Sequence, residues 1–239
     1  MIYRLSKMKD TSSPEMSGAW HALSDRTLAA WEIVSVVSSV LIVEWIAAAV
    51  AGLSLMLLAV PVVLAFTLMA ASHRERTETP NELGFRFDNF GRAFLMLLPP
   101  MIAVTLVFLA IGRLSGSGIS ILRWGAARPL FLQLILGTLW GLAQQYVLQG
   151  FINRRAIIIF GRGWISVLLV AVIFGALHLP NLWLAGITFV GGVIWSATYQ
   201  RTPNLFALAV SHSIMTWVVI STIPPSALHH LRVGFGYFL

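Results

Sequence analysis

The sequence predicts an all-α protein, a polytopic membrane helical bundle of about seven transmembrane helices. Of its 239 residues, 58% are hydrophobic and only 10% are charged, and the mean hydropathy is +0.83. An ordinary soluble domain carries about 25% charged residues. Apolar runs of the length that a membrane helix needs, about 20 residues, also recur along the whole chain. We therefore expect an integral membrane protein.

The predicted spans follow one another with short breaks. The first two are divided only around Gly52, whereas the later ones are separated by polar, glycine or proline residues. Aromatic residues near span ends, such as Trp164, Trp183 and Tyr199, are typical of membrane interfaces. The seven spans are expected at residues 31–51, 53–71, 94–112, 129–155, 164–179, 182–199 and 204–222.

The ends of the chain and its breaks suggest four parts. The first 30 residues are polar and lack the apolar core and cleavage site of a signal peptide, so we expect the first span to be retained. Within the charged stretch 72–93, Thr79 to Glu82 is typical of a helix start, which predicts a short amphipathic helix in a surface loop. The predicted parts are a polar N-terminal segment (1–30), N-terminal membrane helices with the amphipathic loop (31–124), a core (125–222) and a C-terminal tail (223–239).

The net charge of +7 is best explained by membrane topology. The basic residues stand in short loops beside the spans rather than in one patch, so nucleic acid is not an expected partner. If the N-terminus is cytoplasmic, most of them fall on the inner side, as the positive-inside rule requires. This predicts a cytoplasmic N-terminus in a bacterial-type plasma (inner) membrane. The inner residues would be Arg4, Lys7, Lys9, Arg26, Arg74, Arg76, Arg86, Arg92, Arg154, Arg155, Arg162 and Arg201, against Arg113, Arg123, Arg128 and Arg232 outside.

Polar side chains concentrate in three apolar segments of the second half. Polar and ionisable residues inside spans usually face the bundle interior and often mark a site. Gln144 and His178 each lie 17 residues from Gly161, a predicted hairpin turn, so these two side chains are expected at the same membrane depth. The three segments are QQYVLQ with Gln144, Gln145 and Gln149, FGALH with Phe174 and His178, and HSIMT with His212 and Thr216.

Several chemical roles are open to these residues. The alternative for each histidine is a buried imidazole that is hydrogen-bonded to a neighbour and has no chemical task. The alternative for the glutamines is a structural role, in which they form hydrogen bonds between helices worth about 1 kcal/mol each. His178 and His212 are candidate ligands of zinc, but catalytic zinc takes a third protein ligand, for which an amide is a weak candidate. The sequence therefore leaves both zinc and no metal as alternatives. There is no cysteine, and no Asp or Glu follows Asp88.

In this order and spacing, the three segments resemble the motifs of the CPBP family, the CAAX-protease and bacteriocin-processing (Abi) group of intramembrane metalloproteases. Its motifs are EExxxR, FxxxH and HxxxN or HxxxD on successive membrane helices. The resemblance covers roughly residues 125–222, and NELGFR at 81–86 is similar to a stretch that often precedes the family's core. It implies endopeptidase cleavage of membrane-associated proteins or peptides. It also implies that the first glutamate acts as general base, with the histidines and the final Asn binding metal or polarising the scissile carbonyl.

The chain departs from this pattern at the charged positions. Gln144 and Gln145 replace the two glutamates, Gln149 replaces the arginine and Thr216 the final Asn. Removing one partner of a buried ion pair leaves an uncompensated charge, whereas amides at both positions avoid that penalty, and we expect a Gln145–Gln149 hydrogen bond. An amide does not accept a proton near neutral pH, so Gln144 is not the general base.

Three functions follow as hypotheses. The first is a non-hydrolytic relative, a pseudoprotease that binds a peptide, a lipid or a partner protein. The second is an active intramembrane peptidase with a substituted base, either a histidine or Glu44, the acidic residue deep in a span that would otherwise pair with an arginine or a polar neighbour. The third is a membrane transporter, suggested only by the helix count and the polar interior.

Overall fold

The seven predicted spans each coincide with a helical segment of the computed structural model, which describes residues 14–47, 49–50, 55–114, 116, 119–120 and 129–239. No strand occurs in these ranges, and the all-α class is confirmed. The predicted break at Gly52 and most of the polar break at 113–129 lie outside them. In chain order the main helices are α1 (Pro14–Leu41), α2 (Leu55–Glu75), α3 (Pro80–Leu83), α4 (Phe90–Leu114), α5 (Leu130–Gln145), α6 (Arg154–Phe160), α7 (Trp164–Ala176), α8 (Leu182–Arg201) and α9 (Leu205–Thr222).

Four short segments complete the described fold. Two π-helical stretches, η1 (Ile42–Ala47) and η2 (Tyr146–Asn153), continue α1 and α5 without a break. Two 3₁₀ turns, η3 (His229–Leu231) and η4 (Gly234–Phe238), lie in the tail. The segment α5–η2–α6 is thus one continuous helical rod, as the predicted span at 129–155 requires, and it ends a few residues later than predicted.

Five helical segments of the described chain are long and apolar enough to cross a membrane. The first of these, Ser24–Ile46, begins earlier than the predicted span, and α1 itself begins at Pro14. The apolar helix α7 has 13 residues and is shorter than a full crossing.

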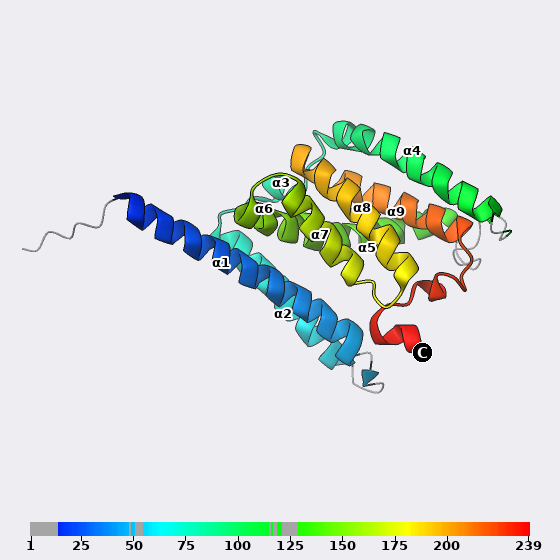
Figure 1. Ribbon diagram of the computed structural model, residues 1–239, viewed down its shortest axis with the longest axis horizontal. Coiled ribbons are helices and arrows are strands. Elements are labelled where there is room, and N and C mark those ends of the chain that lie inside the picture. Colours follow the sequence, from blue (N-terminus) through cyan, green and yellow to red (C-terminus); the bar gives the residue numbers. More distant parts are fainter. Residues whose placement is uncertain (1–13, 48, 51–54, 115, 117–118, 121–128) are drawn as a thin grey trace, which may run out of the picture.

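The helices form a layered bundle with the second half of the chain at its centre. The helices α1 and α2 lie together on one side, α4 lies on the opposite side, and α5, α7, α8 and α9 lie between them (Figure 1). The helix α7 packs along α8, and α9 packs against both α5 and α4. Gly192 permits the α7–α8 contact, because a Cβ atom there would lie 2.8 Å from the Cα of Ala171.

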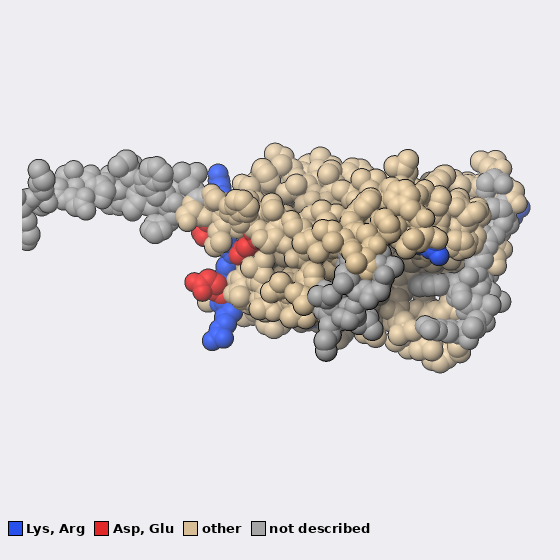
Figure 2. Space-filling view, turned by 90° about the horizontal axis from the view of Figure 1, so that it is seen from below, with Lys and Arg blue, Asp and Glu red and all other residues tan. Residues whose placement is uncertain are grey.

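Charged side chains gather at one end of the described molecule and leave a broad uncharged band beside it (Figure 2). Many of the arginines predicted on the inner side lie at this end: Arg74 and Arg76 at the end of α2, Arg92 at the start of α4, and Arg201 at the end of α8. That arrangement is what the predicted topology requires. Which side of the membrane this end faces stays a prediction.

The loop between α2 and α4 contains the predicted short helix. α3 begins after Thr79, whose hydroxyl accepts the backbone N–H of Glu82, while the Glu82 carboxylate accepts the backbone N–H of Thr79. This reciprocal capping box is the pattern that the sequence indicated. The interpretation of Tyr199 as an interface residue is wrong, because it is 2% exposed and its hydroxyl donates to the carbonyl of Leu83.

Candidate functional site

The first motif lies at the junction of an α-helix and a π-helix. Gln144 and Gln145 are the last residues of α5, and Gln149 lies inside η2. The hydrogen bonds of a π-helix run from i to i+5 instead of i+4, and such stretches are frequent at functional sites. Every residue from Leu148 to Asn153 is buried. The junction therefore changes the direction in which successive motif side chains point.

Gln145 and His212 meet in the interior between α5 and α9. The amide nitrogen Nε2 of Gln145 lies 3.2 Å from Nδ1 of His212. Because an amide N–H only donates, Nδ1 accepts, and the neutral ring carries its proton on Nε2. Gly141, one turn before Gln145, makes this approach possible, since a Cβ atom there would lie 3.1 Å from the Ala209 carbonyl oxygen.

Stacking on an aromatic ring fixes the orientation of His212. The indole of Trp195, on α8, stacks on the imidazole with ring centroids 4.6 Å apart and planes 12° apart. The indole Nε1 donates to Ser211 Oγ at 2.8 Å, and Ser211 Oγ donates to the Leu208 carbonyl. Trp195 is thus held by its own hydrogen bond, so its ring sets the plane of His212.

His178 lies just beyond the end of α7, in the turn before α8, rather than inside a span as predicted. Its Nδ1 lies 2.7 Å from the Phe174 carbonyl oxygen and donates to it, which leaves Nε2 as an acceptor. The Phe174 ring touches both imidazoles, with centroids 4.9 Å from His178 and 6.1 Å from His212. Phe174 therefore connects the two histidines that the sequence singled out.

The C-terminal tail holds the turn that carries His178. Asn181 caps α8 through its Oδ1, and its Nδ2 donates to the carbonyls of Leu228 and Arg232. The backbone N–H of Gly234 donates to the carbonyl of Leu179, next to His178. Sequence reasoning missed this role of the tail, although Asn181 directly before a predicted helix is a capping signal.

Gln149 belongs to a second polar cluster. Its Nε2 donates to Ser196 Oγ at 3.1 Å, and its Oε1 accepts from Asn153 Nδ2 at 2.7 Å. The predicted hydrogen bond between Gln145 and Gln149 is therefore wrong. The physical reason is the π-helical register, which turns Gln149 toward α8 while Gln145 faces α9.

Two amide oxygens at the site are left without donors. Oε1 of Gln144 and Oε1 of Gln145 are both buried, and neither has a hydrogen-bond donor among the described residues. Buried acceptors are nearly always satisfied in native structures, so each of these oxygens needs an explanation. Thr216, the remaining motif residue, lies one turn beyond His212 on α9 and is half-buried.

The donor set does not fit a catalytic zinc ion. Within the described ranges, no group of three His, Cys, Asp or Glu side chains is placed to hold a metal. His178 and His212 supply two imidazoles, and Nδ1 of each is already hydrogen-bonded. Catalytic zinc takes three protein ligands, and the side chains beside the two histidines are amides, so the residues present do not complete a zinc site.

A cluster of buried ion pairs lies at the charged end of the bundle. Arg155, which is 0% exposed, donates to Glu32, Glu78 and Ser72 at distances from 2.7 to 3.0 Å. Arg154 also donates to Glu78. The predicted span at 129–155 ends at Arg155, whereas the helix continues through this residue to Phe160, and α1 supplies Glu32 as its partner. The sequence signal that was missed is Glu32, an acidic residue at the start of an apolar span.

Glu78 is strongly acidic in this cluster. Burial opposes its ionisation, but the hydrogen bond with His73 and the charges and hydrogen bonds of Arg155 and Arg154 outweigh it and lower the pKa to about 2. Glu78 precedes α3, in the loop that follows α2, so the cluster ties α1, α2 and this loop to the central rod.

Glu44 lies at the other end of the bundle, in η1. Its Oε2 is buried and has no hydrogen-bond donor among the described residues. Its backbone packs against Gly234, where a Cβ atom would lie 2.5 Å from the Glu44 carbonyl oxygen. Because Gly234 also bonds to Leu179, Glu44 lies at the same end as His178.

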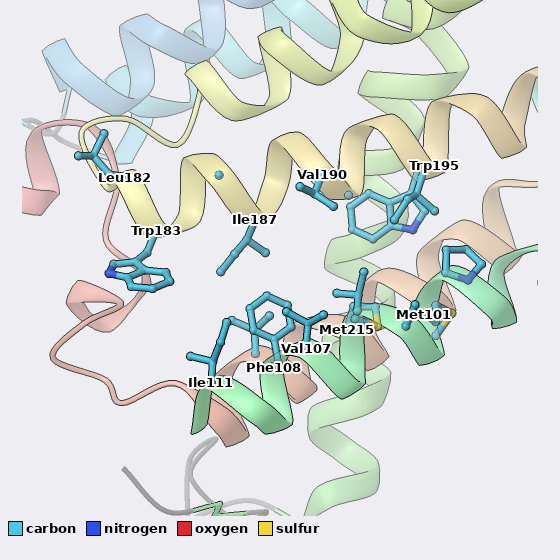
Figure 3. Close-up of a pocket in the computed structure, with 17 residues that line it drawn as sticks. Met101, Val107, Phe108, Ile111, Leu182, Trp183, Ile187, Val190, Trp195 and Met215 are labelled. Carbon is cyan, nitrogen blue, oxygen red and sulfur yellow. The ribbon is translucent and has the colours of Figure 1, made fainter. Parts of the chain in front are cut away.

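A cavity of about 650 Å³ opens beside the site, between α4, α8 and α9 (Figure 3). Its lining is apolar and runs from Ile111 and Trp183 at one end to Met101 and Trp195 at the other. Trp195 therefore separates the cavity from His212, which stacks on the same indole.

Comparison with known proteins gives one family. Residues 126–218 match the family described as type II CAAX prenyl endopeptidase Rce1-like. The matched segment contains all the motif residues of the sequence analysis, from Gln144 to Thr216. No curated protein and no solved structure matches the chain.

Proposed function

We propose that this chain, whose residues 126–218 match the Rce1-like family of type II CAAX prenyl endopeptidases, is a non-hydrolytic member of the CPBP family. In this proposal it binds a peptide segment of a membrane-associated protein in the polar site between α5, α7 and α9. The observation that carries the proposal is the hydrogen bond from the Gln145 amide to His212.

That hydrogen bond lies at the position where peptide hydrolysis would need a general base. The resemblance places a glutamate pair at the positions of Gln144 and Gln145, and a glutamate at the first of them would take a proton from water. An amide has no such capacity near neutral pH. The described partners of the two imidazoles are an amide, a backbone carbonyl and aromatic rings, and none of these is a proton acceptor of the required strength.

The same groups suit a peptide backbone. The amide oxygens of Gln144 and Gln145 have no donors among the described residues, so each is able to accept a peptide N–H. On His212 the neutral ring presents Nε2–H, which donates to a carbonyl. A peptide that satisfies these groups removes their desolvation penalty, about 1–3 kcal/mol for each buried group left unpaired.

The proposal is tested by peptide binding. The protein would be reconstituted in nanodiscs and titrated with a library of fluorescent apolar peptides. Gln145→Met removes the acceptor oxygen and the bond to His212, and we expect it to weaken binding roughly tenfold, the effect of about 1.4 kcal/mol. Gln200→Met is the matched control, because it removes an amide that bonds to Asn153 and Ser166, away from His212. Equal binding by the two variants would count against the proposal.

One observation favours a second function, an active peptidase with a histidine base. The Phe174 carbonyl holds the proton of His178 on Nδ1, so Nε2 is free to accept a proton from water. Cleavage that is lost in His178→Ala and kept in Glu44→Gln would establish this version. Cleavage lost in Glu44→Gln would instead indicate Glu44 as the base.

A further inference from the structure

We propose that the apolar cavity between α4, α8 and α9 binds one acyl chain of a bilayer phospholipid. The cavity lies outside the polar site, and the inference does not depend on the proposed function. Three features support it: the chemistry of the lining, the length of the cavity, and its position beside the membrane.

The lining excludes a peptide. Its side chains are aliphatic or aromatic, apart from the thioethers of Met101 and Met215 and the indole N–H groups of Trp183 and Trp195. The Trp195 N–H already donates to Ser211. A peptide backbone in this space would lose the hydrogen bonds of its N–H and C=O groups, each of which is costly to bury unpaired. A hydrocarbon chain has no such groups.

Water is also a poor occupant. A buried water molecule needs two to four polar partners, and apolar cavities of this kind stay dry. An empty cavity forfeits dispersion contacts along its whole lining. In a bilayer, the acyl chains of the surrounding lipids are available to supply those contacts.

The length of the cavity matches one leaflet. On α4 the lining runs from Pro100 to Ile111, which is about 16 Å at 1.5 Å per residue. On α8 it runs from Leu182 to Trp195, about 20 Å by the same measure. Half of the hydrocarbon core of a bilayer is about 15 Å thick. A chain that enters at one interface would therefore reach Trp195 near the bilayer centre.

The entrance is at the level of an interface and opens sideways. Leu182 and Val107 border the cavity and are 77% and 57% exposed, so its mouth faces the surroundings of the bundle. Trp183 lies at the same end, as Figure 3 shows, and tryptophan is enriched at the headgroup level. Arg113, in the last turn of α4, is close in sequence to Ile111 and is placed for a phosphate headgroup.

Gly186 offers a specific way to close the cavity. It lines the space, and a Cβ atom at this position would meet nothing within 4 Å. Gly186→Leu therefore adds a side chain to the cavity without a clash at its base. Gly91→Leu is the matched control, because Gly91 is also a helical glycine with nothing within 4 Å of its Cβ position but lies outside the cavity.

The test uses a phosphatidylcholine with a diazirine near the end of one acyl chain. The full-length protein is reconstituted in vesicles of this lipid and unlabelled phosphatidylcholine, and crosslinks are mapped by mass spectrometry. We expect labelling of Met101, Ile194 or Met215, at the Trp195 end, and a roughly tenfold loss in Gly186→Leu but not in Gly91→Leu. Uniform labelling of outward-facing residues such as Ile102, unchanged by Gly186→Leu, would overturn the proposal.

A second arm distinguishes the source of the chain. A peptide acylated with the same diazirine chain is added to vesicles of unlabelled lipid. Labelling of the cavity by the peptide alone, and not by the phospholipid, would overturn the proposal in favour of a lipid-modified peptide. If Gly186→Leu does not fold, Val190→Phe takes its place, because Val190 also lines the cavity, nearer its Trp195 end.

Discussion

Replacing Arg155 by methionine should destabilise the protein by about 3 kcal/mol, near the lower end of the range for breaking a buried ion pair. Arg155 donates to Glu32, to both oxygens of Glu78 and to Ser72, and its guanidinium lies 4.5 Å from the centroid of the Phe151 ring. Methionine keeps much of the volume and removes the charge. The loss stays near the lower end because Arg154 still pairs with Glu78 and Arg76 still pairs with Glu32.

The pKa of Glu78 reports on its partners together, namely His73, Arg155 and Arg154. It falls from 4.5 to about 2 on folding, and each pKa unit corresponds to 1.36 kcal/mol, so the ionised form contributes about 3 kcal/mol. Because the folded-state pKa is the lower one, this contribution is present above pH 4.5 and is lost as the pH falls toward 2. Stability should therefore drop across this window in the natural protein, and by a smaller amount in Arg155→Met, where His73 and Arg154 still stabilise the ionised Glu78.

The assay is reversible unfolding in mixed micelles, followed by far-UV circular dichroism at several pH values. Arg201→Met is the control, since Arg201 is exposed at the end of α8 and should change the free energy of unfolding by less than about 0.5 kcal/mol. In the double variant Glu78→Gln, Arg155→Met, the losses should be smaller than the sum of the single losses. A loss below about 1 kcal/mol for Arg155→Met, with the pH dependence unchanged, would show that the Arg155 ion pairs do not stabilise the fold.

Three further predictions concern the polar site. Gly141→Val should separate α5 from α9 and lower the melting temperature, because a Cβ atom at this position lies 3.1 Å from the Ala209 carbonyl oxygen. The control Gly91→Val should lower the melting temperature less, and equal melting temperatures of the two variants would contradict the close approach of α5 and α9. Trp195→Ala should lower the free energy of unfolding by about 3–5 kcal/mol, because a buried aromatic ring that stacks on His212 is lost. Thermal unfolding measures the change, and a clearly smaller loss would contradict the stacking role of the indole. The double variant Gln144→Glu, Gln145→Glu should bind zinc, because its carboxylates add ligands to the two histidines, whereas the natural protein should not. Elemental analysis of both purified proteins measures this, and zinc in both would argue for a working metal site.

The helical bundle could be predicted because a bilayer restricts the secondary structure of the segments that cross it. Apolar runs of about 20 residues give the spans, and the glycines of the GRG sequence at 161–163 predicted the turn between α6 and α7 that the structure contains. The capping box at Thr79 was equally readable, because its pattern is local. The end of α7 was not, since a turn can begin inside an apolar run.

The candidate site was predictable in its residues but only partly in its geometry. Spacing and resemblance brought Gln145, Phe174, His178 and His212 to attention, and the structure brings them into contact. The partners of Gln149 were not predictable, because the change to a π-helix at Tyr146 has no clear sequence pattern. The Arg155 cluster was missed for another reason: its partner Glu32 is more than 120 residues away in sequence.

A cleavage measurement determines whether the protein hydrolyses peptides. The purified protein in nanodiscs would be incubated with a library of apolar and membrane-anchored peptides, beside His178→Ala, and the products identified by mass spectrometry. We expect the peptides to bind and to stay intact with both proteins. Specific cleavage by the natural protein that disappears in His178→Ala would contradict this expectation.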